Sequence, residues 1–403
     1  MTVNFEKEST FENMDISKNN HKNSNKCLPT RRTFMRAFAG GLLVTFVGGA
    51  GVLVQGCNSV KDAADSTILG VRTVTDHAGR EVSIPTAQNI KSVFFTSSLA
   101  QVYITCLCPD LLAGTASKFE ERSLPYLPEG VNKLPYLGTL HNNGEIDREQ
   151  LLKQDIDIMF SISGIELTQQ NISEAIEIQD QTRIPVLLVD GSFDVIPAAF
   201  RFLGDILGRE SRAEELATFC GEFYERVHKV VQTIPESERI GVYYAEGPEG
   251  LQTEPESSQH MLGFLEGGAK CVATCKETYG GGMTDVSLEQ VIKWDPEVIV
   301  GWDVDTRGGA VDDIRTNKNW SNITAVKNGR VYAMPNEPWA WCDRPPGVNR
   351  LIGIHWVANL LYPQYYDVDM VEITQEYFKT MYNVTPSREE VESMLGNSYT
   401  KKA

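Results

Sequence analysis

The chain is poor in positive charge. Its 403 residues include 37 Lys and Arg against 54 Asp and Glu, which gives a formal net charge of −17. A nucleic-acid-binding surface needs clustered cations to neutralise phosphates, so this balance argues against DNA or RNA as a partner. The sequence also lacks a G-x-G-x-x-G loop, a G-x-S-x-G nucleophile elbow and the C-x₂-C spacing of zinc and iron–sulfur sites. No common catalytic or cofactor motif is therefore evident.

Long apolar runs are equally scarce, and the longest lies near the N-terminus. Residues 37–54 are largely apolar but diluted by five glycines, with Arg31 and Arg32 before them and Cys57 shortly after. The arginine pair ahead of a weakly hydrophobic run resembles a twin-arginine export signal. The small residue before Cys57 resembles a lipobox, at which the cysteine is acylated. An uncleaved membrane anchor is the alternative, since about 18 apolar residues is near the lower limit for a span.

This N-terminus predicts where the protein is located. We expect residues 1–56 to be a twin-arginine lipoprotein signal peptide and residues 57–71 to be a polar tether. The body would then stand on the extracytoplasmic face of the cytoplasmic membrane, anchored through lipid on Cys57. That oxidising location leaves open a disulfide that involves Cys271 or Cys275. Cys220 falls on an apolar helical face, where a small buried hydrophobe is expected.

The amphipathic segment Ser211–Ile234 divides the body of the chain. Its apolar residues recur at spacings of three and four, which lines one helical face, and Pro235 ends the pattern. Ser211 and Glu214 have the S-x-x-E spacing of a capping box, so we expect them to begin the helix. Gly221 is the one weak helix former in its interior.

Strand and helix signals alternate on both sides of this segment, which is typical of parallel βαβ units. The fold class predicted is α/β, with two Rossmann-like lobes joined by one long α-helix and a ligand cleft between the lobes. In open parallel sheets, ligands bind beyond the carboxyl ends of the strands. Individual elements include a strand at Leu112–Ala116 and a helix at Lys318–Ala325. The predicted domains are an N-terminal lobe at 72–208, a connecting helix at 209–235, a C-terminal lobe at 236–363 and a polar helical extension at 364–403.

One motif occurs once in each predicted lobe. Glu149-Gln-Leu-Leu-Lys and Glu289-Gln-Val-Ile-Lys each open a short helix, and an acidic residue eight positions after each Glu enters a buried strand. A helix N-terminus favours a carboxylate by ~0.3–1 kcal/mol. That preference explains one such Glu, but it does not require the same motif in both lobes.

With this repeat, the chain resembles the substrate-binding lipoproteins of ABC importers for iron–siderophore, haem and cobalamin ligands, which are class III, helical-spine periplasmic binding proteins. The resemblance covers about Arg72–Pro363. Its other motifs are the opening T-x-x-D-x-x-G-R-x-V-x-x-P, Leu-Gly-x-x-x-Gly-Arg at 203–209, Gly267-Gly268, and Arg344-Pro-Pro before the closing helix. It implies that Glu149 and Glu289 dock onto arginines of the permease. The implied partners are the ABC permease, its ATPase and the membrane, and the protein is expected to be a monomer without a cofactor of its own.

The loops expected at the cleft carry the candidate ligand-binding residues. Aromatic side chains supply flat apolar area, arginine pairs with oxyanions, and a Gly-rich run lets backbone N–H groups approach an anion. Trp302 has the alternative of capping the core, Arg344 that of holding its loop through backbone carbonyls, and His141 that of a hydrogen-bonded loop residue. Trp339 and Trp341 alternate, so only one is expected to face the cleft. The candidates are Ser97, Ser98, Lys118, His141, Tyr244, Gly282, Met283, Trp302, Arg307, Trp339, Trp341 and Arg344.

The leading hypothesis is a lipid-anchored binding protein that delivers a metal chelate to an ABC importer. His77, His228 and His355 fall in a turn and on helices, so no three-His cluster for a bare divalent ion is evident. This favours an intact metal complex, with ferric siderophore first and cobalamin or haem next. An oxyanion such as molybdate or tungstate is the alternative, because of the Gly-rich loop and the arginines. An exported redox enzyme with a bound cofactor is the alternative from another class, and a surface adhesion or sensor module is a third.

Overall fold

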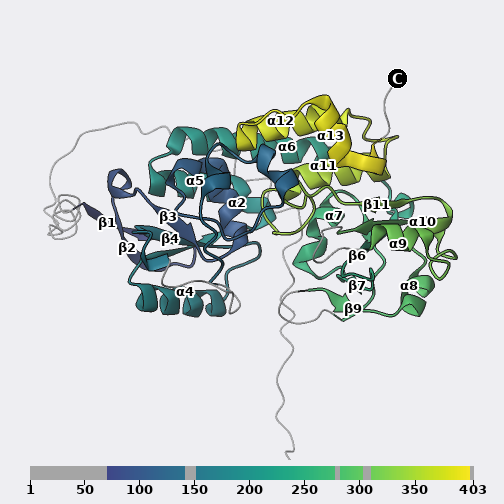
Figure 1. The fold of residues 1–403 in the computed structure, drawn as a ribbon, viewed down its shortest axis with the longest axis horizontal. Helices are drawn as coiled ribbons and strands as arrows, with labels where there is room; N and C mark the ends of the chain where they lie inside the picture. The colour runs from purple at the N-terminus through teal and green to yellow at the C-terminus, as the bar shows by residue number, and fades with distance from the viewer. Residues whose placement is uncertain (1–69, 141–150, 277–281, 303–309, 400–403) are drawn as a thin grey trace, which may run out of the picture. The chain divides into compact units, whose positions relative to one another are not determined.

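The computed structural model describes residues 70–140, 151–276, 282–302 and 310–399 (Figure 1). All of them belong to one compact unit of the chain. The predictions for Arg31, Arg32, Cys57, His141, Glu149 and Arg307 fall outside the described residues. Within those residues, no helix is both long and apolar enough to cross a membrane.

The N-terminal lobe begins with a hairpin and continues into a parallel sheet. The Asp76 carboxylate closes the hairpin turn by accepting hydrogen bonds from the backbone N–H groups of Ala78 and Arg80. It also forms an ion pair with the Arg80 guanidinium. The sheet order is β3-β4-β5, with all neighbours parallel. The strands are β1 (Val71–Thr75), β2 (Glu81–Pro85), β3 (Val93–Phe95), β4 (Ile158–Ser163) and β5 (Val186–Asp190), and the helices are α2 (Ser98–Leu107), α4 (Gln169–Thr182) and α5 (Ile196–Leu207).

The C-terminal lobe repeats the parallel arrangement with the strand order β11-β10-β6-β8. A two-stranded antiparallel pair, β7 with β9, lies beside it. The strands are β6 (Gly241–Ala245), β7 (Gln252–Thr253), β8 (Lys270–Cys271), β9 (Thr284–Asp285), β10 (Val298–Gly301) and β11 (Val331–Ala333), and the helices are α7 (Leu262–Glu266), α8 (Leu288–Trp294), α9 (Val311–Thr316), α10 (Thr324–Lys327) and α11 (Arg350–Leu361).

One continuous helix, α6 (Glu210–Val231), runs between the two lobes (Figure 1). Its apolar face is buried, including Leu216, Cys220, Phe223 and Val227, and it packs against α5 and α11. The predicted α/β fold, with two parallel-sheet lobes joined by one long helix, is confirmed.

The predicted capping box of α6 is wrong. The N-cap is Arg209, without a side-chain cap, and Ser211 lies inside the first turn. The helix begins earlier because α5 ends at Gly208 in the left-handed conformation and turns directly into α6. The two helices are so close that a Cβ on Gly204 would lie 2.3 Å from that of Ala213. Glu214 instead pairs with Arg201 of α5 at 2.6 Å.

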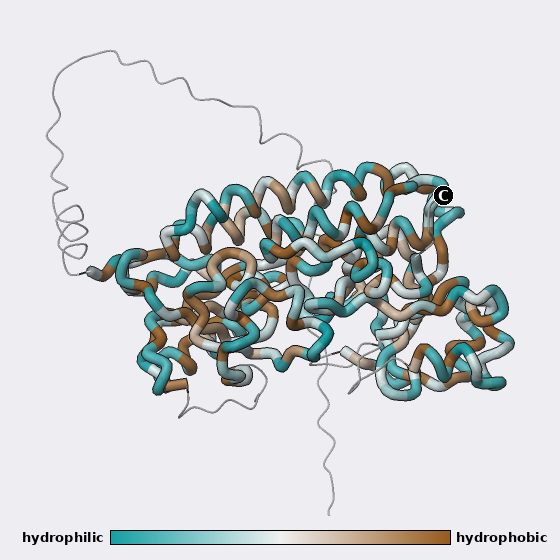
Figure 2. Tube along the Cα trace, turned by 45° about the horizontal axis from the view of Figure 1, so that its top comes forward, coloured by the Kyte–Doolittle hydropathy of each residue, from teal (hydrophilic) through white to brown (hydrophobic). Residues whose placement is uncertain are grey.

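The C-terminal extension is helical as predicted, but it is not polar. It forms α12 (Met370–Tyr382) and α13 (Arg388–Leu395), and α12 buries Tyr377, Phe378 and Tyr382. This apolar face packs against α2, α6 and α11. Figure 2 shows the same alternation of hydrophobic and hydrophilic residues along the helices of the molecule.

Two smaller element predictions are also wrong. Residues 112–116 form only isolated bridges, Val93 with Leu112 and Thr115 with Tyr136, rather than a strand. Residues 318–322 are turns, and the helix α10 begins only at Thr324. It begins there because the Asp295 carboxylate accepts hydrogen bonds from the backbone N–H and hydroxyl of Thr324. In the described part of the chain, the six cysteines from Cys106 to Cys342 are free thiols, Cys271 and Cys275 included.

Candidate functional site

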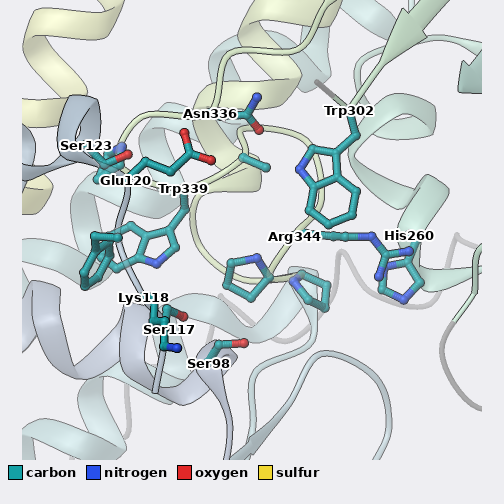
Figure 3. A pocket seen from close by; sticks show the side chains of 15 residues that line it. Ser98, Ser117, Lys118, Glu120, Ser123, His260, Trp302, Asn336, Trp339 and Arg344 are labelled. Carbon is teal, nitrogen blue, oxygen red and sulfur yellow. The ribbon is translucent and has the colours of Figure 1, made fainter. Parts of the chain in front are cut away.

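A cavity of about 440 Å³ lies between the lobes (Figure 3). Its walls come from segments that follow strands: Ser98 after β3, Trp302 after β10, and residues 336–346 after β11. This is the position that parallel sheets give to ligands, beyond the carboxyl ends of their strands. The lining residues are Ser98, Ser117, Lys118, Phe119, Glu120 and Ser123 from the N-terminal lobe, and His260, Trp302, Asn336, Pro338, Trp339, Ala340, Arg344, Pro345 and Pro346 from the C-terminal lobe.

Arg344 is the central charge of the C-terminal wall. Its guanidinium lies 2.8 Å from Glu246, 2.9 Å from Glu254 and 3.3 Å from Asp343. These three carboxylates are fully enclosed, whereas 15% of the Arg344 side chain is exposed. The guanidinium also lies over the Trp302 ring, 5.1 Å from its centroid, in cation–π geometry. The cation therefore reaches the cavity while its counter-charges lie behind it.

His260 extends this charged wall. Its Nδ1 lies 2.6 Å from Asp343, which also receives a hydrogen bond from Tyr244 at 3.3 Å and faces Arg350 at 3.8 Å. Burial alone would raise the pKa of Asp343, but His260, Arg344 and Arg350 hold that pKa below its ordinary value. Asp343 is therefore an ionised carboxylate that orients the imidazole at the cavity edge.

The pKa of Glu246 shifts in the opposite direction to that of Asp343. Burial raises the pKa of Glu246 to about 9, against the attraction of Arg344 and with the repulsion of Asp343 and Glu254. This carboxyl group therefore holds its proton more readily than an exposed glutamate does. The shift reduces the negative charge that the buried cluster places behind Arg344.

The N-terminal wall offers side-chain donors, whereas two of its backbone N–H groups are already hydrogen-bonded within the protein. Ser98 lies in the first turn of α2, and the backbone N–H groups of Ala116 and Ser117 are fixed by hydrogen bonds to Gln101 Oε1. The Lys118 ammonium lies 4.8 Å from the centroid of the Tyr136 ring and is exposed. Figure 3 shows Ser98, Ser117 and Lys118 across the cavity from Arg344 and His260.

Aromatic rings form the remaining walls. Phe119 and Trp339 meet edge to face, with ring centroids 5.6 Å apart, and Trp302 lies on the opposite side (Figure 3). Such rings provide flat apolar area for the organic part of a ligand. The cavity thus combines cationic and hydroxyl groups with aromatic faces.

The structure brings five of the predicted ligand-binding residues together at this cavity: Ser98, Lys118, Trp302, Trp339 and Arg344. For Arg344, the alternative of binding backbone carbonyls is replaced by side-chain ion pairs. Trp339 lines the cavity and Trp341 does not, as their alternation predicted. Trp341 is 1% exposed, because its indole N–H donates to the carbonyl of Glu337 and its ring packs against Phe378.

Four other candidates lie behind the lining or beside it. Tyr244 is buried and donates to Asp343. The backbone N–H of Met283 donates to Glu254 at 2.7 Å, and Gly282 packs directly against the same carboxylate. Ser97 is the N-cap residue of α2 and is not part of the lining. Tyr244, Gly282 and Met283 therefore support the buried cluster and do not face a ligand in this structure.

His260, Ser117, Glu120 and Asn336 were missed. The partner of His260, Asp343, is 83 residues away in sequence, so no local pattern connects the two. The available signal was the place of His260 at the end of the loop after β6, since such loops lie at the carboxyl edge of the sheet. Across the described ranges, no group of three or more His, Cys, Asp or Glu side chains is arranged to hold a metal ion.

Comparisons with known proteins agree with this architecture. The family model described as "Periplasmic binding protein" matches residues 123–338, which is more than half of the chain. An ABC transporter solute-binding protein of Sulfurospirillum deleyianum DSM 6946 has a solved structure that is 29% identical, covers 80% of this chain and 98% of its own, and has a TM-score of 0.72.

Two more distant relatives span most of the chain. The molybdate-binding protein MolA of Haemophilus influenzae is 22% identical over 342 residues, 79% of this chain and 92% of its own, and its molybdate-bound structure has a TM-score of 0.63. The ABC transporter substrate-binding lipoprotein YvrC of Bacillus subtilis is 23% identical over 324 residues, 78% of this chain and 94% of its own. With the two-lobed fold and the cavity between the lobes, the family match shows that the chain belongs to the periplasmic binding protein family and is a substrate-binding protein of the ABC-importer type rather than an enzyme.

Proposed function

We propose that this protein captures an anionic metal chelate, most readily a ferric siderophore, in the cavity between its lobes. The observation that carries the proposal is the combination of Arg344, His260 and Lys118 with the rings of Phe119, Trp302 and Trp339 around one cavity. Arginine and lysine pair with anionic oxygens of a chelate, and the rings contact its organic framework.

The size of the cavity supports a ligand larger than a bare ion. At about 440 Å³ it falls in the range of small-molecule sites, which is about 300–1,000 Å³. A single oxyanion would leave most of this space, including the aromatic walls, without a contact. Haem and cobalamin rank after the ferric siderophores.

A molybdate or tungstate ligand is the second candidate. Arg344 and His260 lie on the same wall of the cavity, and the two side chains are enough to bind a small oxyanion. His260 Nδ1 lies 2.6 Å from Asp343, so its Nε2 is left for the ligand. The likeness to the molybdate-binding protein of Haemophilus influenzae favours the same chemistry.

A thermal-shift panel on the soluble body distinguishes these candidates. It contains ferric catecholate and hydroxamate siderophores, the same chelators without iron, haemin, cobalamin, molybdate and tungstate. The expected result is stabilisation by a ferric siderophore alone, about 2.7 kcal/mol at a hundredfold excess over its Kd. A shift with molybdate or tungstate only would replace the chelate with an oxyanion, and no shift with any ferric chelate would contradict the proposal.

The proposed function includes anchoring and delivery. Export through Arg31 and Arg32, lipidation at Cys57 and a tether over 57–71 would place the lobes, 72–208 and 236–363, at the outer face of the cytoplasmic membrane. The likeness to a Bacillus subtilis lipoprotein supports this arrangement. Delivery to an ABC permease and its ATPase would use Glu149 and Glu289, and the exposure of Glu289 in the first turn of α8 supports that role.

A further inference from the structure

The C-terminal helix α12 lies outside the family match yet reaches the wall of the cavity. Its last residue, Tyr382, has its ring centroid 5.5 Å from that of Trp339. Phe119 lies 5.6 Å from the same indole. Phe119 and Trp339 line the cavity, whereas Tyr382 is 2% exposed and lies behind them.

The indole of Trp339 depends on these rings for its orientation. Among the residues that the structure describes, its enclosed N–H has no hydrogen-bond partner. Trp341, two residues later, is instead fixed by a hydrogen bond of 2.9 Å to the carbonyl of Glu337. Trp339 also lies on the irregular segment between β11 and α11, so no regular backbone hydrogen bonding restrains it.

The helix α12 is itself firmly held. The Arg212 guanidinium of α6 donates to the carbonyls of Thr380 and Met381, just before Tyr382. Phe378 contacts Tyr126 of the N-terminal lobe, with ring centroids 5.8 Å apart, and Trp341 of the C-terminal lobe at 6.4 Å. The position of the Tyr382 ring is therefore tied to α6 and to both lobes.

We propose that Tyr382 is a positioning residue for ligand binding: through it, α12 holds Trp339 as a rigid wall of the cavity. This proposal rests on the proposed function, because a fixed indole matters for a chelate that touches the aromatic wall. A small oxyanion bound only by Arg344 and His260 would be insensitive to it. The C-terminal extension is then part of the binding site rather than an appendage.

The test compares Tyr382→Ala with Tyr382→Phe in the soluble body. Affinities are measured by titration with ferric catecholate and ferric hydroxamate siderophores, with molybdate alongside. Tyr382→Ala is expected to weaken binding of the ferric chelate about tenfold, the scale of a lost aromatic contact. Tyr382→Phe keeps the ring and is expected to retain wild-type affinity. A folded Tyr382→Ala protein with unchanged chelate affinity would overturn the proposal.

A matched control separates positioning from loss of stability. Leu395→Ala removes a buried side chain of α13 that is 2% exposed and is not part of the cavity lining. It is expected to lower the melting temperature without changing affinity. An equal loss of affinity in this variant would reduce Tyr382 to a general structural role.

A spectroscopic readout tests the positioning without any ligand. The protein is labelled with 5-fluorotryptophan, and the Trp339 signal is assigned by its absence in Trp339→Phe. Tyr382→Ala is expected to shift and broaden that fluorine signal, and Tyr382→Phe to restore it. An unchanged signal would overturn the proposal. If no ferric chelate binds the wild-type protein, the proposed function fails while this signal still decides whether α12 positions Trp339.

Discussion

Arg344 illustrates how a single side chain can serve both the fold and the ligand. Its partners Glu246 and Glu254 are fully enclosed, and they come from a segment 98 and 90 residues away in sequence. Burial raises the pKa of Glu246, which reduces the negative charge behind the guanidinium. The guanidinium itself reaches the cavity surface.

Replacement of this residue is therefore expected to affect both stability and binding. In Arg344→Gln, the enclosed carboxylates lose their partner, which costs about 3–5 kcal/mol for a buried ion pair. Binding of an anionic ligand is expected to weaken by more than tenfold, because the cation at the cavity surface is lost. Denaturant unfolding and ligand titration, at a temperature where the variant is folded, measure the two effects.

Arg226→Gln provides the matched control. Arg226 makes a comparable ion pair with Glu376 at 2.6 Å, but both side chains are about 40% exposed and lie outside the cavity. Its loss is expected to cost about 0–1 kcal/mol and to leave affinity unchanged. Wild-type affinity in a folded Arg344→Gln protein would remove Arg344 from the ligand site.

At the scale of elements, the contact between α6 and α11 depends on a neutral histidine. His355 of α11 bonds the carbonyl of Phe223 at 2.9 Å and accepts from the Tyr366 hydroxyl. It is fully enclosed against the Phe223 ring, with centroids 3.9 Å apart. Burial lowers the pKa of His355 to about 3, so the imidazole stays uncharged in the folded protein.

This pKa predicts acid sensitivity with a defined sign. The unfolded chain protonates His355 below about pH 6.5, whereas the folded chain does not until about pH 3. Stability is therefore full above pH 6.5 and falls as the pH decreases through that window, on the order of 3 kcal/mol by pH 4 from this residue. His355→Gln is expected to be less stable at pH 7.5 but to approach the wild type at pH 4. Denaturant unfolding at several pH values checks this, and parallel curves would contradict it.

The elements also show how far sequence reasoning extends. The bounds of the helix α5 were predictable, because its apolar period and Gly208 both lie within one short segment. The start of α6 was not predictable, because Glu214 pairs with Arg201 of the neighbouring helix α5 and does not form a local capping box. The apolar face of α12 was present in the spacing of Tyr377, Phe378 and Tyr382, but the polar composition of the extension outweighed it.

The candidate site was predictable for a similar reason. Residues in the segments that follow strands, such as Ser98, Trp302 and Arg344, could be identified because parallel sheets gather those segments at one edge. The carboxylates around Arg344 and the pairing of His260 with Asp343 could not, since their partners are distant in sequence. Local sequence patterns do not specify contacts between residues that are far apart in sequence.

At the scale of the whole molecule, α6 lies in the sequence between two copies of one motif. In the second copy, Ser287 caps α8, Val291 is buried and Ile292 is 39% exposed. In the first copy, Leu151 is buried and Leu152 is 58% exposed, which matches the same pattern. The backbone N–H groups and Ser287 lower the pKa of Glu289, so this exposed carboxylate stays ionised at mildly acidic pH.

The repeat of the motif, with Glu149 in one lobe and Glu289 in the other, predicts a bivalent docking surface. Exposed ion pairs are worth only about 0–1 kcal/mol each, so a complex held by two of them can still dissociate after delivery. Glu149→Arg combined with Glu289→Arg turns both attractions into repulsion. Transport of the ligand identified by the panel is expected to be abolished, while titration should show unchanged ligand affinity. Loss of affinity in this variant would place the two residues in the cleft instead.

The control must change the net charge by the same amount on another face. Glu210 and Glu389 are exposed and lie in the first turns of α6 and α13, which Figure 1 draws on the side away from α8. Glu210→Arg with Glu389→Arg is therefore expected to leave transport close to the wild type. Equal loss of transport in both double variants would attribute the effect to total charge rather than to docking. Loss in the first alone would show that delivery requires Glu149 and Glu289 rather than a given total charge.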